Sequence, residues 1–208
     1  MQHYIFDLDG TLLDSMELWA GTHRKTLEDA GIPVPENFVE TITPLGNQGA
    51  SEFVLSLGVP KSLEQYLEEV GRIFIYEYSH NVPLKPHVTE TLMHLKQAGV
   101  GLQVLTAGHH RCADPCLKRC GIWDLFENVW SMHDFGLSKD QPEIYLAAAE
   151  RLGVRPEDCV MVDDNCIALQ AAKDAGLQTV GVFDRSSAGS EALMRSFAHR
   201  YIYDLAEL

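Results

Sequence analysis

The first apolar run of the chain leads directly into two like charges. Residues 4–6, Tyr-Ile-Phe, favour a strand, and Asp7 and Asp9 follow with only one leucine between them. A strand buried on both faces can hold such a pair of carboxylates at the rim of a sheet. We therefore predict a buried strand over Tyr4–Leu8 that ends in acidic side chains.

The segment that follows repeats its apolar positions at helical spacing and contains no convincing strand. Asp14 followed by Glu17 is typical of a helix start, and Gly31 with Pro33 ends that helix. Further helical patterns cover residues 36–43, 48–57 and 62–78. The pattern therefore predicts a small all-helical unit.

From Pro83 onward, helical and strand-like patterns alternate. A helix is predicted over residues 88–98 and a strand over 102–105. Further strands are predicted over 129–131, 159–162 and 179–183, and further helices over 116–120, 142–152 and 167–175, the first of these opened by Asp114 and Pro115. Such alternation is typical of an α/β fold, in which helices cover both faces of a parallel sheet. We predict an α/β core made of residues 1–14 and 82–208, with a helical domain inserted at 15–81.

Composition and charge narrow the class of protein. The chain has 208 residues, of which 46% are hydrophobic and 22% charged, as in an ordinary globular protein. Thirty acidic against sixteen basic residues give a formal net charge of -14, which argues against nucleic acid or an anionic membrane surface as a partner. Either the acidic excess serves solubility, or some of the acids hold a cation.

The absence of recognised targeting signals and the number of cysteines indicate the cellular compartment that we expect. No apolar run reaches the roughly eighteen residues that a membrane helix requires, and no signal peptide is recognised. The five cysteines are odd in number and lie in one half of the chain, unlike a secreted disulfide framework. We therefore expect a cytoplasmic protein with no membrane partner, and the sequence leaves the oligomeric state open.

Polar residues follow four of the predicted strands, at the rim where open α/β sheets bind ligands. They are Asp7 and Asp9, then Thr106, Ala107 and Gly108, then Lys139, and finally Asp163 and Asp164. Carboxylates from separate strands repel one another unless a cation lies between them, and oxygen ligands suit Mg²⁺. The sequence therefore predicts a Mg²⁺ site that takes a substrate phosphate as a further ligand.

The other residues at this rim fit phosphoryl transfer. Lys139 and the Thr106 hydroxyl can hold phosphate oxygens, and the backbone beside the small residue Ala107 can approach an anion closely. A shielded carboxylate can attack phosphorus and form an aspartyl-phosphate. Asp9, two residues after Asp7, is placed to give a proton to the leaving oxygen and later to take one from water.

Four ordered motifs, FDLDGTLLDS, VLTAG, SKDQPEIYLAAAERLGV and MVDDNCIALQAAKDAGL, resemble those of the haloacid dehalogenase superfamily. The resemblance implies a Rossmann-like core with a helical cap inserted after the first motif. It implies that Asp7 is the nucleophile and Asp9 the general acid and base. It further implies that Thr106 binds phosphate and that Lys139 neutralises charge.

The resemblance also implies a metal shell. Asp164 is the implied direct ligand, together with Asp7 and the backbone carbonyl of Asp9. Asp163 either contacts the metal, directly or through water, or serves the structure of its loop. Thr106 has a structural alternative as well, because hydroxyls at strand ends often bind nearby backbone amides. Ala107 departs from the family, which often has an asparagine there, so that side-chain contact is absent.

The choice of activity depends on three positions. The dehalogenase branch lacks the second aspartate, so the presence of Asp9 favours phosphoryl transfer. In the sugar-phosphate mutase branch, a cap histidine and a loop arginine would fall at Trp19 and Gly49. Their absence favours hydrolysis of a small phosphorylated metabolite, in the manner of phosphoglycolate phosphatases, over a mutase. A non-catalytic protein that binds a phosphate ligand is the alternative of another class.

Substrate choice is expected to lie with the cap. Trp19, His23 and Arg24 are candidates to face the leaving group, as is the glycine-bearing loop Leu45–Glu52. Packing within the cap or exposure to solvent is the alternative for each side chain.

Overall fold

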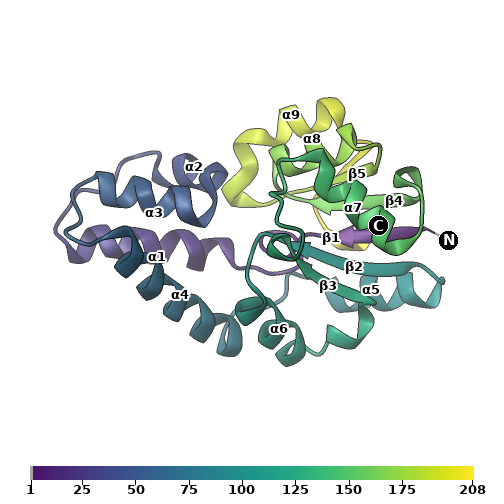
Figure 1. Ribbon diagram of the computed structural model, residues 1–208, viewed down its shortest axis with the longest axis horizontal. Helices are drawn as coiled ribbons and strands as arrows, with labels where there is room; N and C mark the ends of the chain where they lie inside the picture. The colour runs from purple at the N-terminus through teal and green to yellow at the C-terminus, as the bar shows by residue number, and fades with distance from the viewer. Residues whose placement is uncertain (1) are drawn as a thin grey trace.

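The structure is a computed structural model that describes residues 2–208 (Figure 1). Its centre is a six-stranded sheet in the order β3-β2-β1-β4-β5-β6, in which all neighbouring strands are parallel. The strands are β1 (His3–Phe6), β2 (Gly101–Thr106), β3 (Asn128–Ser131), β4 (Cys159–Asp163), β5 (Gln178–Val182) and β6 (Arg200–Ile202). Because β1 is central, the residues that follow it lie in the middle of the sheet's carboxyl edge.

Successive side chains of β1 point to opposite faces of the sheet, and each face has its own apolar core. Tyr4 and Phe6 belong to one apolar cluster, whereas Ile5 belongs to the other. The first cluster includes residues of α5 (Val88–Gln97) and α6 (His110–Arg119). The second includes residues of α7 (Pro142–Leu152), α8 (Cys166–Asp174) and α9 (Glu191–Phe197). Helices therefore cover both faces, and the predicted α/β class with a parallel sheet is confirmed.

Four α-helices form an insertion between β1 and α5. They are α1 (Met16–Asp29), α2 (Phe38–Ile42), α3 (Gly46–Ser56) and α4 (Leu63–His80), and Figure 1 shows them together at one end of the long axis. Buried side chains such as Leu27, Val54 and Val70 pack between them. The all-helical insertion is therefore present, whereas the limits 1–14, 15–81 and 82–208 stay a prediction.

The two chain segments that join the helical insertion to the core lie side by side. The Asp14 amide donates to the Pro83 carbonyl at 3.0 Å, and the Lys85 amide donates to the Leu12 carbonyl at 2.9 Å. The Lys85 ammonium donates to the Gly10 carbonyl and pairs with Asp184 at 2.8 Å. This mostly buried lysine thus joins the return segment to the loop after β1.

Four local predictions differ from the structure, and one of them is the loop expected over Leu45–Glu52, because Gly46–Ser56 form α3. β1 ends at Phe6, so Asp7 already lies in the loop. The helix predicted to begin at Asp114 and Pro115 begins instead at His110, and Pro115 lies inside it. Packing of its buried face, which includes Cys116 and Leu117, outweighs the missing hydrogen bond at the proline. The pair α9 and β6 was not predicted.

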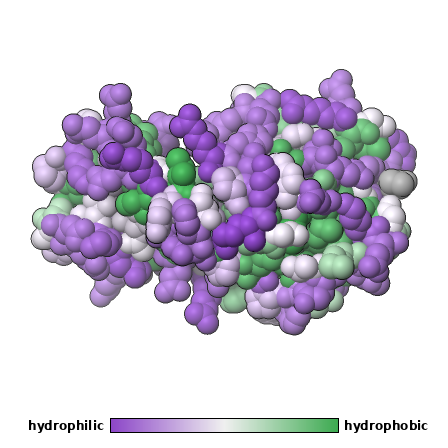
Figure 2. All heavy atoms as spheres, turned by 90° about the horizontal axis from the view of Figure 1, so that it is seen from below, coloured by the Kyte–Doolittle hydropathy of each residue, from purple (hydrophilic) through white to green (hydrophobic). Residues whose placement is uncertain are grey.

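The surface is largely polar. Figure 2 shows hydrophilic side chains over most of the face drawn, with apolar atoms between them. Across residues 2–208, no helix combines the length and apolar composition needed to cross a bilayer.

The interior of the insertion contains a histidine whose protonation is costly. His23 is fully buried, its Nδ1 lies 2.8 Å from the Tyr66 hydroxyl, and its Nε2 has no hydrogen-bond partner among residues 2–208. Burial lowers the pKa of His23 from 6.5 to about 4. In the unfolded chain this imidazole takes up a proton below its ordinary pKa, whereas the folded state does not, so acidification from pH 6.5 towards 4 removes stability.

We expect His23→Gln to reduce this acid sensitivity. Between pH 7.5 and pH 5 the wild type should lose about 2 kcal/mol more of its free energy of unfolding than the variant does. Urea unfolding at both pH values measures the difference, with the exposed His94→Gln as the matched control. Equal losses in wild type and His23→Gln would contradict the prediction.

Candidate active site

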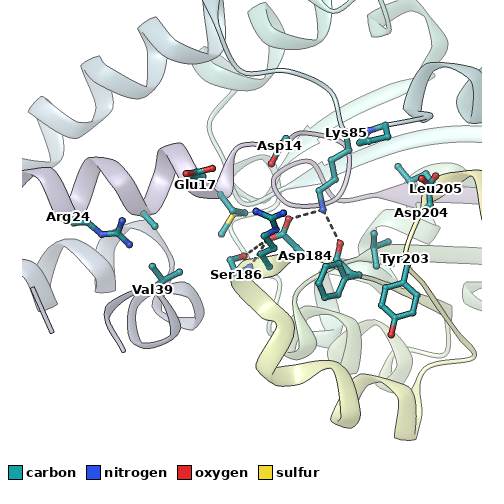
Figure 3. A pocket seen from close by; sticks show the side chains of 16 residues that line it. Asp14, Glu17, Arg24, Val39, Lys85, Asp184, Ser186, Tyr203, Asp204 and Leu205 are labelled. Carbon is teal, nitrogen blue, oxygen red and sulfur yellow. Dashed lines mark hydrogen bonds and ion pairs between the residues drawn. The ribbon is translucent and has the colours of Figure 1, made fainter. Parts of the chain in front are cut away.

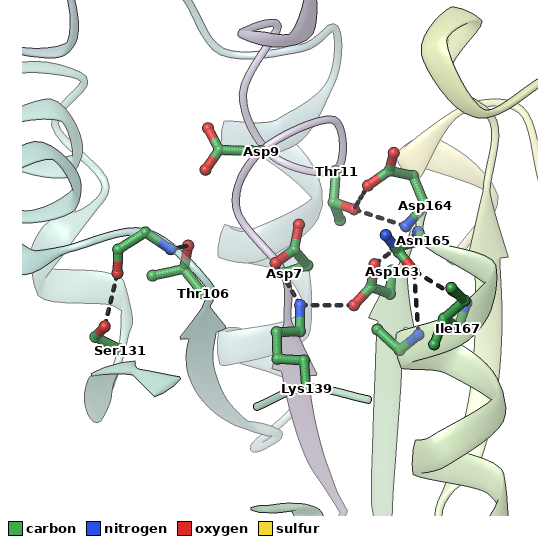
Figure 4. A network of polar contacts seen from close by, with 12 residues as sticks. Asp7, Asp9, Thr11, Thr106, Ser131, Lys139, Asp163, Asp164, Asn165 and Ile167 are labelled. Atoms are coloured by element: carbon green, nitrogen blue, oxygen red, sulfur yellow. Dashed lines mark hydrogen bonds and ion pairs between the residues drawn. The ribbon is translucent and has the colours of Figure 1, made fainter. Parts of the chain in front are cut away.

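The predicted site residues lie at the carboxyl edge of the sheet. Figure 4 shows Asp7 between Thr106 on one side and Asp163 and Asp164 on the other. The Asp7 amide donates to the Val162 carbonyl at 2.9 Å, which holds the start of the loop after β1 against β4. Side chains that are far apart in the sequence therefore meet as the strand order predicts.

Lys139 lies between two buried carboxylates. Its Nζ is 2.5 Å from Asp7 Oδ1 and 2.7 Å from Asp163 Oδ2. The Asn165 amide donates to the other oxygen of Asp163 at 2.7 Å, and Tyr145 donates its hydroxyl to the Lys139 carbonyl at 2.9 Å. Burial alone would lower the pKa of Lys139, but the charges of Asp163 and Asp7 raise this pKa above its usual value. The lysine is therefore charged and held in place.

Asp164 forms none of the ion pairs found among residues 2–208, and Lys85, whose charge lowers the pKa of Asp164, pairs with Asp184 instead. The Thr11 hydroxyl lies 3.3 Å from its carboxylate and accepts from its amide at 3.1 Å. A Cβ on Gly10, which has a φ of 79°, would lie 2.6 Å from Asp164 Oδ2. Glycine is therefore required here both for the backbone conformation and for the close approach of this carboxylate.

The acidic residues fit a divalent cation. Asp7, Asp163 and Asp164 are buried, and one oxygen from each lies within 4.8 Å of the others. Burial raises the pKa of Asp7 to about 7, with Asp163 and Asp9 adding to the rise and Lys139 opposing it. Burial, and then the charge of Asp163, raises the pKa of Asp164 well above its ordinary value. Lys139 pairs with Asp7 and Asp163 but not with Asp164, and an oxygen-only set suits Mg²⁺.

Asp9 lies apart from this acidic group. Its carboxylate points away from Asp163 and Asp164 in Figure 4, and its Oδ1 accepts hydrogen bonds from Ser15 at 2.7 Å and from Tyr78. Burial raises the pKa of Asp9, whereas these two hydrogen bonds lower it. Its side chain is thus separate from the cluster of Asp7, Asp163 and Asp164.

The last residue of β2, Thr106, contributes a hydroxyl at this edge. Thr106 is buried and accepts from the Gly108 amide at 2.9 Å, so the structural alternative for this hydroxyl is realised. The same oxygen keeps its own proton, which it can donate to a ligand. Ser131 donates to the Gly108 carbonyl at 2.7 Å and braces the loop, while Ala107 is exposed.

The three cap candidates differ in position. His23 is buried inside the insertion and stacks edge-on with Trp19, whose ring centroid lies 5.0 Å away. Arg24 is exposed and lines a cavity of about 620 Å³ between α1 and the segment after β5, which Lys85 and Asp184 also line (Figure 3). None of the catalytic candidates lines that cavity.

The sequence also matches a known family over most of its length. Residues 4–182 match the family described as haloacid dehalogenase-like hydrolase. The chain belongs to this family. The resemblance inferred from the four motifs is therefore confirmed, and the predicted hydrolase class is that of the family.

Relatives and solved structures agree with this assignment. A phosphorylated carbohydrates phosphatase of Thermotoga maritima is 29% identical over 199 residues, which cover 95% of this chain and 92% of the relative. A beta-phosphoglucomutase of Bacillus subtilis is 27% identical over 190 residues, covering 88% and 83%. The structure of CbbY from Rhodobacter sphaeroides in complex with phosphate has a TM-score of 0.83 at 24% identity, covers 100% of this chain and 96% of its own, and shows the shared fold.

Several side chains at the site were not identified from the sequence. Thr11 lies in the first motif, two residues after Asp9, and this position could have indicated that it belongs to the site. Ser15 and Lys85 bind the loop after β1 from the two joining segments. Tyr78 comes from the far end of the inserted helices, and nothing in its local sequence indicates contact with Asp9.

Proposed function

We propose that the protein is a Mg²⁺-dependent phosphatase that hydrolyses a small phosphomonoester through an aspartyl-phosphate on Asp7. The observation that carries the proposal is the buried contact of Asp7 with Lys139, in a group of three buried aspartates whose oxygens lie within 4.8 Å of one another. Bound Mg²⁺ would supply positive charge that offsets the phosphate oxygens during transfer. Asp7, Asp164 and the backbone carbonyl of Asp9 are the proposed ligands, and Asp163 both adjoins them and anchors Lys139.

Each step assigns a task to one side chain. Asp7 attacks phosphorus, while Lys139 and the Thr106 hydroxyl, with the backbone at Ala107, hold the phosphate oxygens. Asp9 protonates the leaving oxygen and then accepts a proton from the water that hydrolyses the aspartyl-phosphate. The separation of the Asp9 side chain from the acidic cluster supports this division of roles.

A mutase is the second candidate, because a beta-phosphoglucomutase is among the relatives. Trp19 packs edge-on against His23, and Gly49 lies in α3 with Leu45 against it, so neither position supplies a histidine or an arginine for a second phosphate. Hydrolysis is therefore the activity that we propose.

Removal of divalent metal tests the proposal. We expect phosphate release from a panel of small phosphomonoesters to fall at least about 100-fold with EDTA, because the buried carboxylates then repel the substrate phosphate. Excess Mg²⁺ should restore it. Conversion of glucose 1-phosphate to glucose 6-phosphate would favour the mutase, and binding without phosphate release would favour the non-catalytic reading.

A further inference from the structure

Two hydroxyl groups bind the same oxygen of Asp9. Ser15, at the start of the insertion, donates to Oδ1 at 2.7 Å, and Tyr78, at its end, donates to the same oxygen. A Cβ on Gly108 would lie 3.7 Å from Oδ2 of Asp9 and 3.3 Å from the Thr106 hydroxyl. The second carboxylate oxygen therefore faces the loop that is proposed to hold phosphate.

The position of Tyr78 is fixed by packing on the core. It lies in the last turns of α4, is buried, and packs against Phe74 with ring centroids 6.3 Å apart. Arg119 of α6 donates to the Tyr78 carbonyl from two guanidinium nitrogens, at 3.3 and 3.2 Å, and also to the Val82 carbonyl. The hydroxyl therefore reaches Asp9 from a backbone that is itself tied to the core.

Satisfying a buried hydroxyl does not by itself account for this contact. A buried tyrosine needs some acceptor, and a backbone carbonyl would be enough. Here the acceptor is Asp9, the proposed proton-transfer group, which lies 69 positions away in the sequence. Ser15 donates to the same oxygen of Asp9. A carboxylate with one oxygen held by two donors has lost its freedom to rotate, so only Oδ2 remains free.

We propose that Tyr78 is a positioning residue for Asp9, fixing Oδ1 so that Oδ2 carries the proton to the leaving group. The inference rests on the proposed function. As the ester P–O bond breaks, the proton moves from Oδ2 to the departing oxygen, and Asp9 becomes a carboxylate. The attacking water later returns a proton to Oδ2, while its oxygen bonds to phosphorus and the Asp7–phosphorus bond breaks.

The leaving group provides a test that a purely structural role would not satisfy. A p-nitrophenolate departs without protonation, whereas the alkoxide of glycerol 3-phosphate requires it, and kcat/KM reports the steps through leaving-group departure. In Tyr78→Phe we expect kcat/KM for glycerol 3-phosphate to fall about tenfold and that for p-nitrophenyl phosphate to fall less than about threefold. Tyr76→Phe, an exposed tyrosine on the same helix, is the matched control and should change neither value.

The outcomes separate this inference from the proposed function. A wild type that releases phosphate from neither ester and from no other member of the phosphomonoester panel overturns both proposals. A wild type that hydrolyses both esters, with equal losses or no loss in Tyr78→Phe, overturns only the role of Tyr78. Higher kcat/KM for glycerol 3-phosphate in Tyr78→Phe would show that the hydroxyl restrains Asp9 instead of orienting it. Thermal unfolding of each variant checks that the fold is intact.

Discussion

Asp7→Asn is expected to reduce phosphate release by at least about 10³-fold, because the amide oxygen is too weak a nucleophile to form the phosphoenzyme. The variant should remain folded. It removes one of three neighbouring buried carboxylates, so its melting temperature without metal is expected to equal or exceed that of the wild type. Steady-state phosphate release and thermal unfolding measure the two effects.

The control for Asp7→Asn is another aspartate-to-asparagine substitution in the same segment. Asp14→Asn replaces an exposed aspartate in the same segment and should retain wild-type turnover. If Asp7→Asn retained more than about one tenth of the wild-type rate, the attacking group would have to be water or another side chain, and the covalent route would be wrong.

Lys139→Met is expected to have the largest effect on stability. It leaves Asp7 and Asp163 buried and facing each other without the cation that now lies 2.5 and 2.7 Å from them. Loss of one partner from a buried ion pair costs about 3–5 kcal/mol, which corresponds to a decrease of about 6–20 °C in melting temperature for a chain of this size. Differential scanning calorimetry in the absence of metal measures the change.

A surface lysine provides the comparison. Lys25 pairs with Asp29 at 2.9 Å, but both side chains are largely exposed, so Lys25→Met should alter the melting temperature little. A decrease of less than about 2 °C in Lys139→Met would mean that the carboxylates relax or take up protons without cost to the fold. Phosphate release by this variant should also fall, since the phosphate loses its fixed positive charge.

The sequence predicted the parts of the fold that follow from periodicity. Short apolar runs located five of the six strands, because burial on both faces of a parallel sheet requires them, and helical apolar spacing located the inserted helices. The strand β6 has three residues, of which Arg200 is exposed, so no apolar run indicates it. The predicted helix start at Pro115 is wrong. Local propensity places proline in the first turn, but α6 begins at His110 because its buried face, with Ala113, Cys116 and Leu117, packs on the core.

The candidate site could be predicted only where a strand end determines it. Asp7, Asp163 and Asp164 converge because their strands are neighbours, and this adjacency follows from the α/β rule. The partners of Lys139 were not foreseen, because contact with two aspartates depends on the path of a loop rather than on a strand. The contact of Tyr78 with Asp9 depends on how α4 packs against α6, which no local pattern encodes.

The side-by-side joining segments have a consequence for how such a protein diversifies. Because Asp14 and Pro83 are hydrogen-bonded neighbours, the inserted helices leave and re-enter the core at one point. The packing of the core therefore does not depend on how many residues the insertion has. The entropy cost of closing such a loop also grows only slowly with its length. Evolution can lengthen, shorten or replace this segment while the aspartates and Lys139 keep their places. The exception is any exchange that discards Tyr78, since a new insertion would have to supply another donor for Asp9.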